Sequence, residues 1–329
     1  MAGLACAIIA FLISPFHPMA SLINPDILAR QDALAARFRP RDPFRYLVID
    51  DFFAADYVAQ LFDQFPPFER GNARNEAGEI GNKSTVERIR RLGPAYSALD
   101  DLVQSREFLD LVGRITGIDD LLYDPWYFGG GTHENRQGQD LDAHVDFNRH
   151  PVQRWHRRLN LIVYLNHEWY DEWGGCLQLH SDPRSADDRI ITVVPTFNRA
   201  VIFETTETSW HGFPRIALPT GRQALARKSV ALYFYTKDRP AEETADTHST
   251  IYVDAPLPAR FAAGHTLNVD DVAELHSLLL RRDQHNQRLY RDLTAMTARF
   301  EQVQAALYAG GLGRLRHVAQ IALRRWRSR

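Results

Sequence analysis

The feature that most constrains this chain is a histidine and an aspartate with one residue between them, His144 and Asp146. In a β-strand, residues two apart point to the same face of the sheet, so both side chains can reach one metal ion. A third ligand is available at His211, within the sequence Ser-Trp-His-Gly. Two histidines and one carboxylate form a facial triad, which suits Fe(II) and leaves other coordination positions open.

Composition limits the kind of protein that can carry this triad. The 329 residues are 45% hydrophobic and 24% charged, which is typical of a soluble globular protein with a substantial core. A net charge of −2 argues against nucleic acid as the main partner. The two cysteines, Cys6 and Cys176, lie far apart in the sequence, so we expect no disulfide framework. We therefore expect a reducing compartment and a cytoplasmic location.

An apolar run at residues 4–13 has no preceding Lys or Arg, unlike the start of a signal peptide. It is also shorter than the ~20 residues of a membrane-spanning helix. The favoured interpretation is that translation starts at Met19, and a weak membrane anchor is the alternative.

Helical spacing precedes strand-like spacing along the chain. Helices are expected at 27–37, 54–65 and 95–116, a strand at 45–50, and a polar, glycine-bearing loop at 70–91. Short β-rich segments follow at 123–128, 143–147, 158–166, 176–180, 189–195, 200–204 and 228–236. Short strands separated by turn residues predict an antiparallel sandwich or barrel. We therefore expect a mostly β fold, with helices packed outside a jelly roll.

The predicted organisation has four parts. These are an N-terminal segment with a helix (1–40), a main domain (41–240), a linker (241–267) and a helical extension (268–329).

The extension begins with N-cap and first-turn residues at 268–271 and stays helical to Tyr308. This helix could pair with a copy of itself in a homodimer. Residues 312–329 hold six arginines and a tryptophan at helical spacing. They predict peripheral contact with the inner face of a membrane or with an acidic partner, and a solvated end of the helix is the alternative.

Several motifs surround the triad in a fixed order. They are Trp-Tyr-Phe-Gly-Gly-Gly-Thr-His (126–133), Arg-Leu-Asn-Leu-Ile-Val-Tyr-Leu-Asn (158–166), Trp-Gly-Gly-Cys-Leu-Gln-Leu (173–179), Asn-Arg-Ala-Val-Ile-Phe (198–203) and Arg-Lys-Ser-Val-Ala-Leu-Tyr-Phe-Tyr (227–235). Together they resemble the prolyl 4-hydroxylase-like branch of the 2-oxoglutarate/Fe(II) dioxygenases, over about residues 45–236. The resemblance implies a double-stranded β-helix in which His144, Asp146 and His211 hold Fe(II).

The resemblance also implies that 2-oxoglutarate chelates the iron, while an arginine on the strand after the distal histidine holds its far carboxylate. Arg227 has the planar fork that matches a carboxylate, and strand alternation places it on one face with Ser229. Arg215 and Arg222 lie in a connection with Pro and Gly, and we expect them to face solvent.

Further side chains are expected beside the cosubstrate. Tyr164 shares a strand face with Asn160 and matches a family tyrosine that hydrogen-bonds the same carboxylate. Tyr127 matches a second tyrosine on the cosubstrate side, and Leu177 is expected to form an apolar wall. The alternative for both tyrosines is a place in the aromatic core.

The implied reaction is decarboxylation of 2-oxoglutarate by O₂ with hydroxylation of a C–H bond, supported by ascorbate. A small residue at position 146 would open a halide site, so Asp146 disfavours halogenation. The triad also lacks the third histidine of a hydrolytic zinc site.

The substrate is harder to predict. A cationic segment at residues 149–158 suggests an anionic or saccharide-like small molecule, and its alternative is a solvated loop. A prolyl peptide is the rival substrate. A non-catalytic jelly-roll scaffold is a weaker alternative, because a scaffold has no need for the triad together with Arg227.

Overall fold

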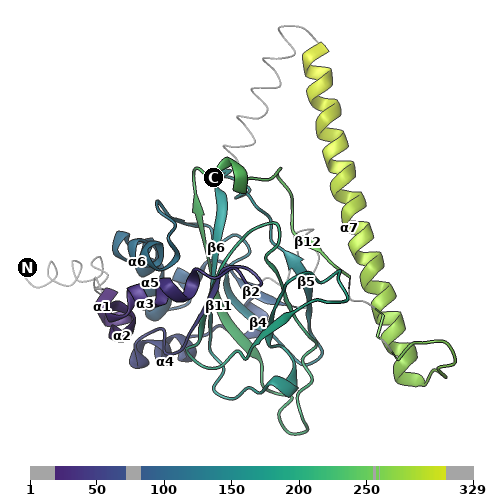
Figure 1. Ribbon diagram of the computed structural model, residues 1–329, viewed down its shortest axis with the longest axis horizontal. Helices are drawn as coiled ribbons and strands as arrows, with labels where there is room; N and C mark the ends of the chain where they lie inside the picture. The colour runs from purple at the N-terminus through teal and green to yellow at the C-terminus, as the bar shows by residue number, and fades with distance from the viewer. Residues whose placement is uncertain (1–18, 72–82, 255–256, 259, 309–329) are drawn as a thin grey trace, which may run out of the picture. The chain divides into compact units, whose positions relative to one another are not determined.

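The computed structural model describes residues 19–71, 83–254, 257–258 and 260–308 (Figure 1). The chain divides into two compact units, Met1–Val253 and Asp254–Arg329. The apolar run at 4–13, Cys6 and the basic tail at 312–329 lie outside the described residues. Within the described part, none of the helices has the length and apolar character needed to cross a membrane.

Helices make up most of the N-terminal part of the first unit. They are α1 (Met19–Leu22), α2 (Pro25–Ala29), α3 (Gln31–Phe38), α4 (Ala55–Asp63), α5 (Pro94–Gln104) and α6 (Arg106–Thr116), with short 3₁₀ turns at Phe68–Arg70 and Ile89–Arg91. The segment 95–116, which was expected to be helical, holds the two helices α5 and α6. Ser105 has extended dihedrals, which ends α5, and its hydroxyl accepts from Phe108 N at the start of α6.

The strands form two antiparallel sheets. They are β1 (Tyr46–Ile49), β2 (Ser84–Val86), β3 (Leu122–Tyr123), β4 (Gly131–Asn135), β5 (Leu141–Val145), β6 (His156–Tyr164), β7 (Leu177–His180), β8 (Ile190–Val193), β9 (Ala200–Glu204), β10 (Trp210–Phe213), β11 (Arg227–Thr236) and β12 (Ile251–Tyr252). The major sheet has the order β1-β9-β6-β11-β4-β2, with β3 joined to β11. The minor sheet has the order β12-β5-β10-β7-β8. This is the expected jelly-roll core with flanking helices.

The two faces of the major sheet pack against different layers. On β6, Leu159, Leu161 and Val163 join the large hydrophobic core that includes the helices. On the opposite face, Tyr164 packs with residues of the minor sheet in a second, smaller core. Figure 1 shows α3 to α6 gathered on one side of the major sheet, with β5 and β12 on the other. The interior between the two sheets is therefore where inward-pointing polar residues meet.

Four strands were not expected from the sequence, namely β2, β4, β10 and β12. The strand β12 lies within residues 241–267, which were expected to be a linker. It extends the minor sheet, because Tyr252 pairs with His144 and Ile251 with Val145. The linker expectation is corrected for these residues.

The strand expected at 123–128 is cut short after Tyr123. The Asp124 carboxylate accepts hydrogen bonds from the backbone N–H groups of Trp126 and Phe128, at 2.8 and 2.7 Å, and folds the chain into a turn. In the loop expected at 70–91, residues 84–86 form β2 on the edge of the major sheet, and residues 72–82 lie outside the described part.

The second unit is dominated by one long helix, α7 (Val269–Tyr308). The expected N-cap is present: the Asn268 side chain accepts from Asp271 N at 2.9 Å, and the Asp271 carboxylate accepts from Asn268 N at 3.0 Å. Arg260 and His265 also pair with Asp271, which attaches the preceding loop to the first turn of the helix.

Candidate active site

Three potential metal ligands meet at the neighbouring strands β5 and β10 of the minor sheet. His144 on β5 and His211 on β10 are register partners, and Asp146 follows the end of β5. The Nε2 atom of His144 lies 3.8 Å from Asp146 Oδ1, and that of His211 lies 3.6 Å from Asp146 Oδ2. All three ligand atoms lie within 4.8 Å of one another. One metal ion can therefore contact the three side chains together.

Backbone carbonyls fix the orientation of both imidazoles. The Nδ1 atom of His144 lies 2.9 Å from Asp142 O, and that of His211 lies 2.9 Å from Ser209 O. A carbonyl only accepts, so each Nδ1 carries the proton and each Nε2 keeps a lone pair for the metal.

Both histidines are also held neutral. Burial lowers the pKa of His144 to about 3, with a further decrease from nearby His211, although Asp146 opposes the change. Burial likewise lowers the pKa of His211. The neutral imidazole is the form that binds a metal.

The Asp146 carboxylate is positioned by two side chains of β6. Asn160 Nδ2 donates to Asp146 Oδ2 at 2.8 Å, and Arg157 Nη2 lies 3.1 Å from the same oxygen. Arg157 in turn donates to Asn160 Oδ1 through Nε and Nη2. Burial raises the pKa of Asp146, but Arg157 and the two histidines outweigh it, so this pKa lies below its ordinary value. The carboxylate therefore stays ionised and ready to bind a cation.

The guanidinium of Arg157 is enclosed by aromatic rings. Its carbon lies 3.7 Å from the centroid of Tyr233 and 4.4 Å from that of Phe147. Only 1% of Arg157 is exposed. Sequence reasoning placed Asn160 on the cosubstrate side, whereas the structure shows it bound to Asp146.

The cationic segment at 149–158 is exposed only in part. His150, Arg157 and Arg158 are buried, and Arg154 remains exposed. The pairing of β6 with β11 shifts register between Phe234 and Tyr235. This irregularity changes the face of the sheet to which side chains at this end of β6 point. Arg157 can therefore reach Asp146.

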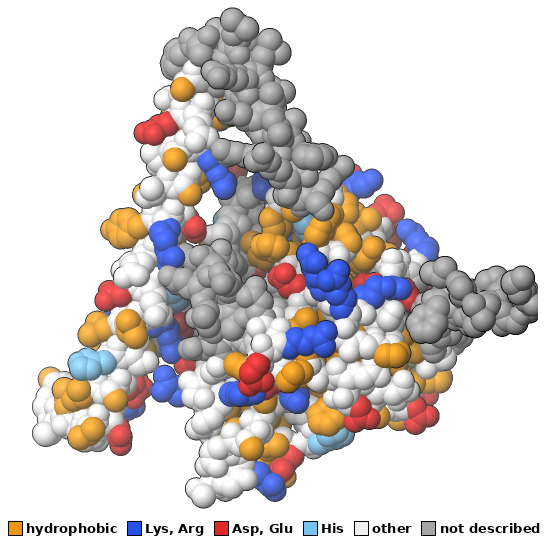
Figure 2. Space-filling model, turned by 180° about the vertical axis from the view of Figure 1, so that it is seen from behind, with side chains coloured by type: hydrophobic (Ala, Val, Ile, Leu, Met, Phe, Trp, Pro, Cys, Tyr) orange, Lys and Arg blue, Asp and Glu red, His pale blue; other side chains and the backbone are white. Residues whose placement is uncertain are grey.

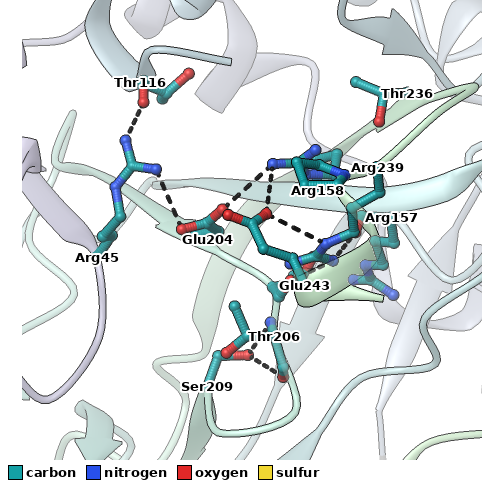
Figure 3. Close-up of polar contacts among 12 residues, drawn as sticks. Arg45, Thr116, Arg157, Arg158, Glu204, Thr206, Ser209, Thr236, Arg239 and Glu243 are labelled. Atoms are coloured by element: carbon teal, nitrogen blue, oxygen red, sulfur yellow. Dashed lines mark hydrogen bonds and ion pairs between the residues drawn. The ribbon is translucent and has the colours of Figure 1, made fainter. Parts of the chain in front are cut away.

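Arg158 belongs to a separate ionic network (Figure 3). It pairs with Glu204 at 3.4 Å and with Glu243 at 3.3 Å. Arg45 contacts the same Glu204 at 3.3 Å and donates to the carbonyl of Thr116. Because Glu243 lies in the segment after β11, this network attaches that segment to β6 and β9 on its way to β12.

Arg227 forms a second polar centre on the inner face of β11. It is 5% exposed, its Nε donates to Gly175 O at 2.5 Å, and its Nη2 donates to the Tyr164 hydroxyl at 3.2 Å. The Phe213 ring lies 4.3 Å from its guanidinium carbon. Phe213 is two residues from His211 on β10, so this ring links the arginine to the strand of a metal ligand.

The charge of Arg227 has no carboxylate partner within the part of the chain that the structure describes. A buried, unpaired charge is costly, which favours an anionic ligand at this point. Two further buried atoms, Ser229 Oγ and Asn135 Oδ1, also lack hydrogen-bond partners among the described residues. Asn135 is the register partner of Arg227, and Ser229 is that of Tyr164. Sequence reasoning missed Asn135, since its strand, β4, was not recognised.

The other candidates from the sequence lie as follows. Leu177 is buried in the small core with Tyr164. Arg222 pairs with Glu168 at 3.1 Å and Arg215 lies 3.7 Å from Asp140, with about half of each arginine side chain exposed. Both arginines therefore face solvent, as expected.

Tyr127 makes its contacts on the helical side of the major sheet. Its hydroxyl donates to Asp100 Oδ1 on α5 at 2.8 Å, and its ring belongs to the core that includes the helices. The backbone of Tyr127 has a positive φ of 51°, which sends the chain out of strand alternation. The structure therefore places Tyr127 in the aromatic core, which was the alternative for this residue.

Two glycines allow the backbone to approach closely at the site. A Cβ atom on Gly212 would lie 2.5 Å from Leu141 O, between β10 and β5. A Cβ atom on Gly175 would lie 2.9 Å from Ile216 Cγ1 and 3.3 Å from Arg227 Cδ, at a φ of +69°. Side chains at these positions would disturb the metal ligands and Arg227, respectively.

The donor sets fit Fe(II) and a dicarboxylic acid. Two neutral imidazole nitrogens and one carboxylate oxygen make up the triad typical of non-haem Fe(II). The buried guanidinium and the unpaired Ser229 hydroxyl offer donors to a carboxylate.

Comparison with known proteins identifies a family model that matches part of the chain. The family model described as the 2OG-Fe(II) oxygenase superfamily matches residues 130–235. No curated protein matches the chain.

Similar solved structures include a prolyl hydroxylase from Trichoplax adhaerens, in complex with a hypoxia inducible factor peptide fragment. It is 15% identical, with 67% of this chain and 96% of that chain covered and a TM-score of 0.47. A prolyl 4-hydroxylase from Phytophthora capsici is 19% identical, with coverages of 78% and 75% and a TM-score of 0.45. HygX from Streptomyces hygroscopicus, with nickel and 2-oxoglutarate bound, is 15% identical, with coverages of 64% and 92% and a TM-score of 0.39.

The residues matched by the family model include His144, Asp146, His211 and Arg227, so they contain both polar centres of the jelly roll. Residues 130–235 of this chain therefore match the 2OG-Fe(II) oxygenase superfamily, a family of enzymes that use Fe(II) and 2-oxoglutarate.

Proposed function

We propose that this oxygenase hydroxylates an unactivated C–H bond of a small molecule that carries a saccharide-like or anionic group. The observation that carries the proposed chemistry is the buried Arg227, without a carboxylate partner among the described residues, in the same interior as the His-Asp-His cluster. In this proposal His144, Asp146 and His211 hold Fe(II), and Arg227 binds the far carboxylate of 2-oxoglutarate. When bound, Fe(II) and 2-oxoglutarate supply with O₂ the oxidation that converts C–H to C–OH.

Tyr164 assists Arg227 in binding that carboxylate. Burial raises the pKa of Tyr164, so its hydroxyl stays protonated. The hydroxyl oxygen accepts from Arg227, and its own hydrogen is available for a carboxylate oxygen. Ser229 and Asn135 supply further polar groups at the same place.

Apolar side chains exclude water around this carboxylate site. Leu177 and Phe203 are buried in the small core with Tyr164, and Phe213 covers the guanidinium. The Phe203 ring also lies 4.7 Å from the His211 ring, which links this core to the metal ligands. A low local dielectric strengthens the contact between guanidinium and carboxylate.

The substrate side is expected to include an aromatic wall. Phe147 directly follows Asp146, and its ring centroid lies 5.6 Å from that of Phe128, of which 38% is exposed. Aromatic faces suit the apolar face of a sugar ring. Arg154, an exposed cation held by Thr247 at 3.1 Å, can attract an anionic group. These features support a small, polar substrate.

The segment after β11 supports a compact substrate site as well. Asn148 lies two residues after Asp146, donates to Asp246 O at 2.7 Å and accepts from His248 N at 3.1 Å. This part of the chain therefore lies against the residues next to the metal cluster. An extended peptide would have to avoid that segment.

The test has two stages. The purified enzyme with Fe(II), 2-oxoglutarate and ascorbate is first assayed for succinate formation without added substrate, with His144→Ala as the inactive control. Saccharide-containing extracts and a set of proline-containing peptides are then screened by mass spectrometry for a product heavier by one oxygen atom. A 2-oxoglutarate-dependent product from the extracts supports the proposal. A product from the peptides alone overturns the substrate class, and no succinate under any condition overturns the chemistry.

A further inference from the structure

The apolar side chains of α7 follow a seven-residue repeat. Assigning position a to Val272 and position d to Leu275 makes nine of the eleven a and d positions up to residue 307 apolar. The nine are Val272, Leu275, Leu279, Leu289, Leu293, Met296, Phe300, Val303 and Leu307. A strict a/d pattern is the narrow seam of a coiled coil, whereas a helix that packs on a globular core has a wider apolar stripe.

Much of this seam is exposed within the described chain. The exposed fractions are 58% for Leu279, 58% for Leu289, 57% for Leu293, 66% for Met296 and 62% for Phe300. Figure 2 shows hydrophobic side chains separated by polar ones along the helix. Burying such side chains removes apolar surface from water, which favours association. Most of the stability of a helix in a protein comes from packing its apolar face.

The two polar residues of the seam are Arg282 at a d position and Asn286 at an a position. Arg282 Nε lies 3.3 Å from Asp254 Oδ2, so its charge is paired within its own chain. His285 Nδ1 binds the other oxygen of Asp254 at 2.6 Å. A continuous apolar seam therefore begins after residue 286.

Asn286 identifies the partner. In a parallel two-stranded coiled coil, an asparagine at an a position meets the same asparagine of the other helix and fixes register and strand number. This contact is self-complementary, so a second copy of α7 satisfies it.

The residues that flank the seam are compatible with the same pairing. In a parallel pair, the g residue of one helix faces the e residue of the next repeat in the other. Asp292 would then face Thr297 of the second copy, and Arg299 would face Gln304. Neither pair brings like charges together. Tyr290, which is 70% exposed, lies at an e position and can pack against the edge of the seam.

We propose that two copies of this chain form a parallel coiled-coil dimer through residues 286–307, with the two Asn286 side chains in contact. The occupant of the exposed face of α7 is thus a second α7. This pairing is independent of the reaction that the catalytic domain performs.

The mass of the full chain in solution tests the dimer. Light scattering after size-exclusion chromatography is expected to give twice the 37.7 kDa of one chain. Leu293→Asp places a charge in the seam and is expected to yield monomers with unchanged succinate formation. The matched control Ala295→Asp adds the same charge at a c position, outside the seam, and is expected to remain dimeric. A monomeric wild-type chain, or a dimeric Leu293→Asp variant, overturns the proposal.

The orientation is tested by disulfide formation. In a Cys6→Ser background, Asn286→Cys brings two thiols together only if the helices are parallel and in register, because bridged Cα atoms lie within about 7 Å. We expect a cross-linked dimer on a non-reducing gel, and none for Gln287→Cys at a b position. A dimer that fails to cross-link through position 286 overturns the parallel arrangement. A monomer that sediments with anionic vesicles assigns the seam to a membrane and also overturns the proposal.

Discussion

Arg157 and Asp146 form a largely buried ion pair, with Arg157 Nη2 3.1 Å from Asp146 Oδ2. The pair is reinforced by Asn160, which binds both residues, and by the rings of Phe147 and Tyr233 around the guanidinium. The arginine therefore holds one carboxylate of the metal cluster in place without itself being a ligand. It acts as a positioning residue.

Replacing Arg157 by Met is expected to weaken metal binding about 10- to 100-fold, since residues that orient metal ligands typically contribute that much. The Asp146 carboxylate would lose its cation and part of its fixed orientation. Titration of the metal-free protein with Co(II), followed by absorbance, measures the change. Arg106→Met, on the exposed side of α6, is the control and should bind as the wild type does. Equal affinities for both variants would contradict the positioning role.

Replacing Arg227 by Met is expected to raise the KM for 2-oxoglutarate about 10- to 100-fold. The physical reason is the loss of hydrogen bonds to a charged group, which contribute about 1.5–3 kcal/mol. Steady-state kinetics over a range of 2-oxoglutarate concentrations provides the measurement. Arg222→Met removes an arginine that pairs with Glu168 at the surface, so its KM should not change. The assignment of Arg227 to the carboxylate of 2-oxoglutarate fails if Arg222→Met raises this KM and Arg227→Met does not.

The stability of the metal-free protein is expected to fall as the pH drops below about 6.5. Burial lowers the pKa values of His133, His144 and His211, so these histidines bind protons in the unfolded chain before they do in the folded one. Each can reduce the free energy of unfolding by up to about 1.4 kcal/mol per pH unit. Urea denaturation between pH 7.5 and 5.5 measures this slope. His133→Gln should have a shallower slope, and an unchanged slope would contradict the role of burial.

Gly212→Ala is expected to lower both metal affinity and stability. The added Cβ would lie 2.5 Å from Leu141 O, so β10 would have to move away from β5. These strands carry His211 and His144, so moving the strands apart would disrupt the geometry of the three metal ligands. Co(II) titration and urea denaturation of the same preparation report the two effects. An alanine variant with wild-type Co(II) affinity would show that the strands can adjust without moving the ligands.

The sequence predicted side-chain directions correctly where those directions follow from strand alternation. His144 and Asp146 converge because they lie two apart at the end of a strand, and Arg227 points inward with Ser229 for the same reason. The length of α7 followed from its N-cap and its periodicity.

Sequence reasoning failed where tertiary contacts override the local pattern. Tyr127 leaves the expected strand because Asp124 folds the chain into a turn. Arg157 faces the metal cluster at an end of β6 where pairing with β11 shifts register, and nothing in the local sequence marks that shift. The short strands β4 and β12 have weak intrinsic preference and depend on the neighbours that pair with them.

The pairing of β12 with β5 has a practical consequence for anyone who shortens this protein. A fragment ending at residue 240 would leave the outer edge of β5 without hydrogen-bond partners and would remove the Tyr252 ring that stacks on His144 at 5.1 Å. The smallest fragment worth expressing therefore ends at Val253, well beyond the last residue matched by the family model.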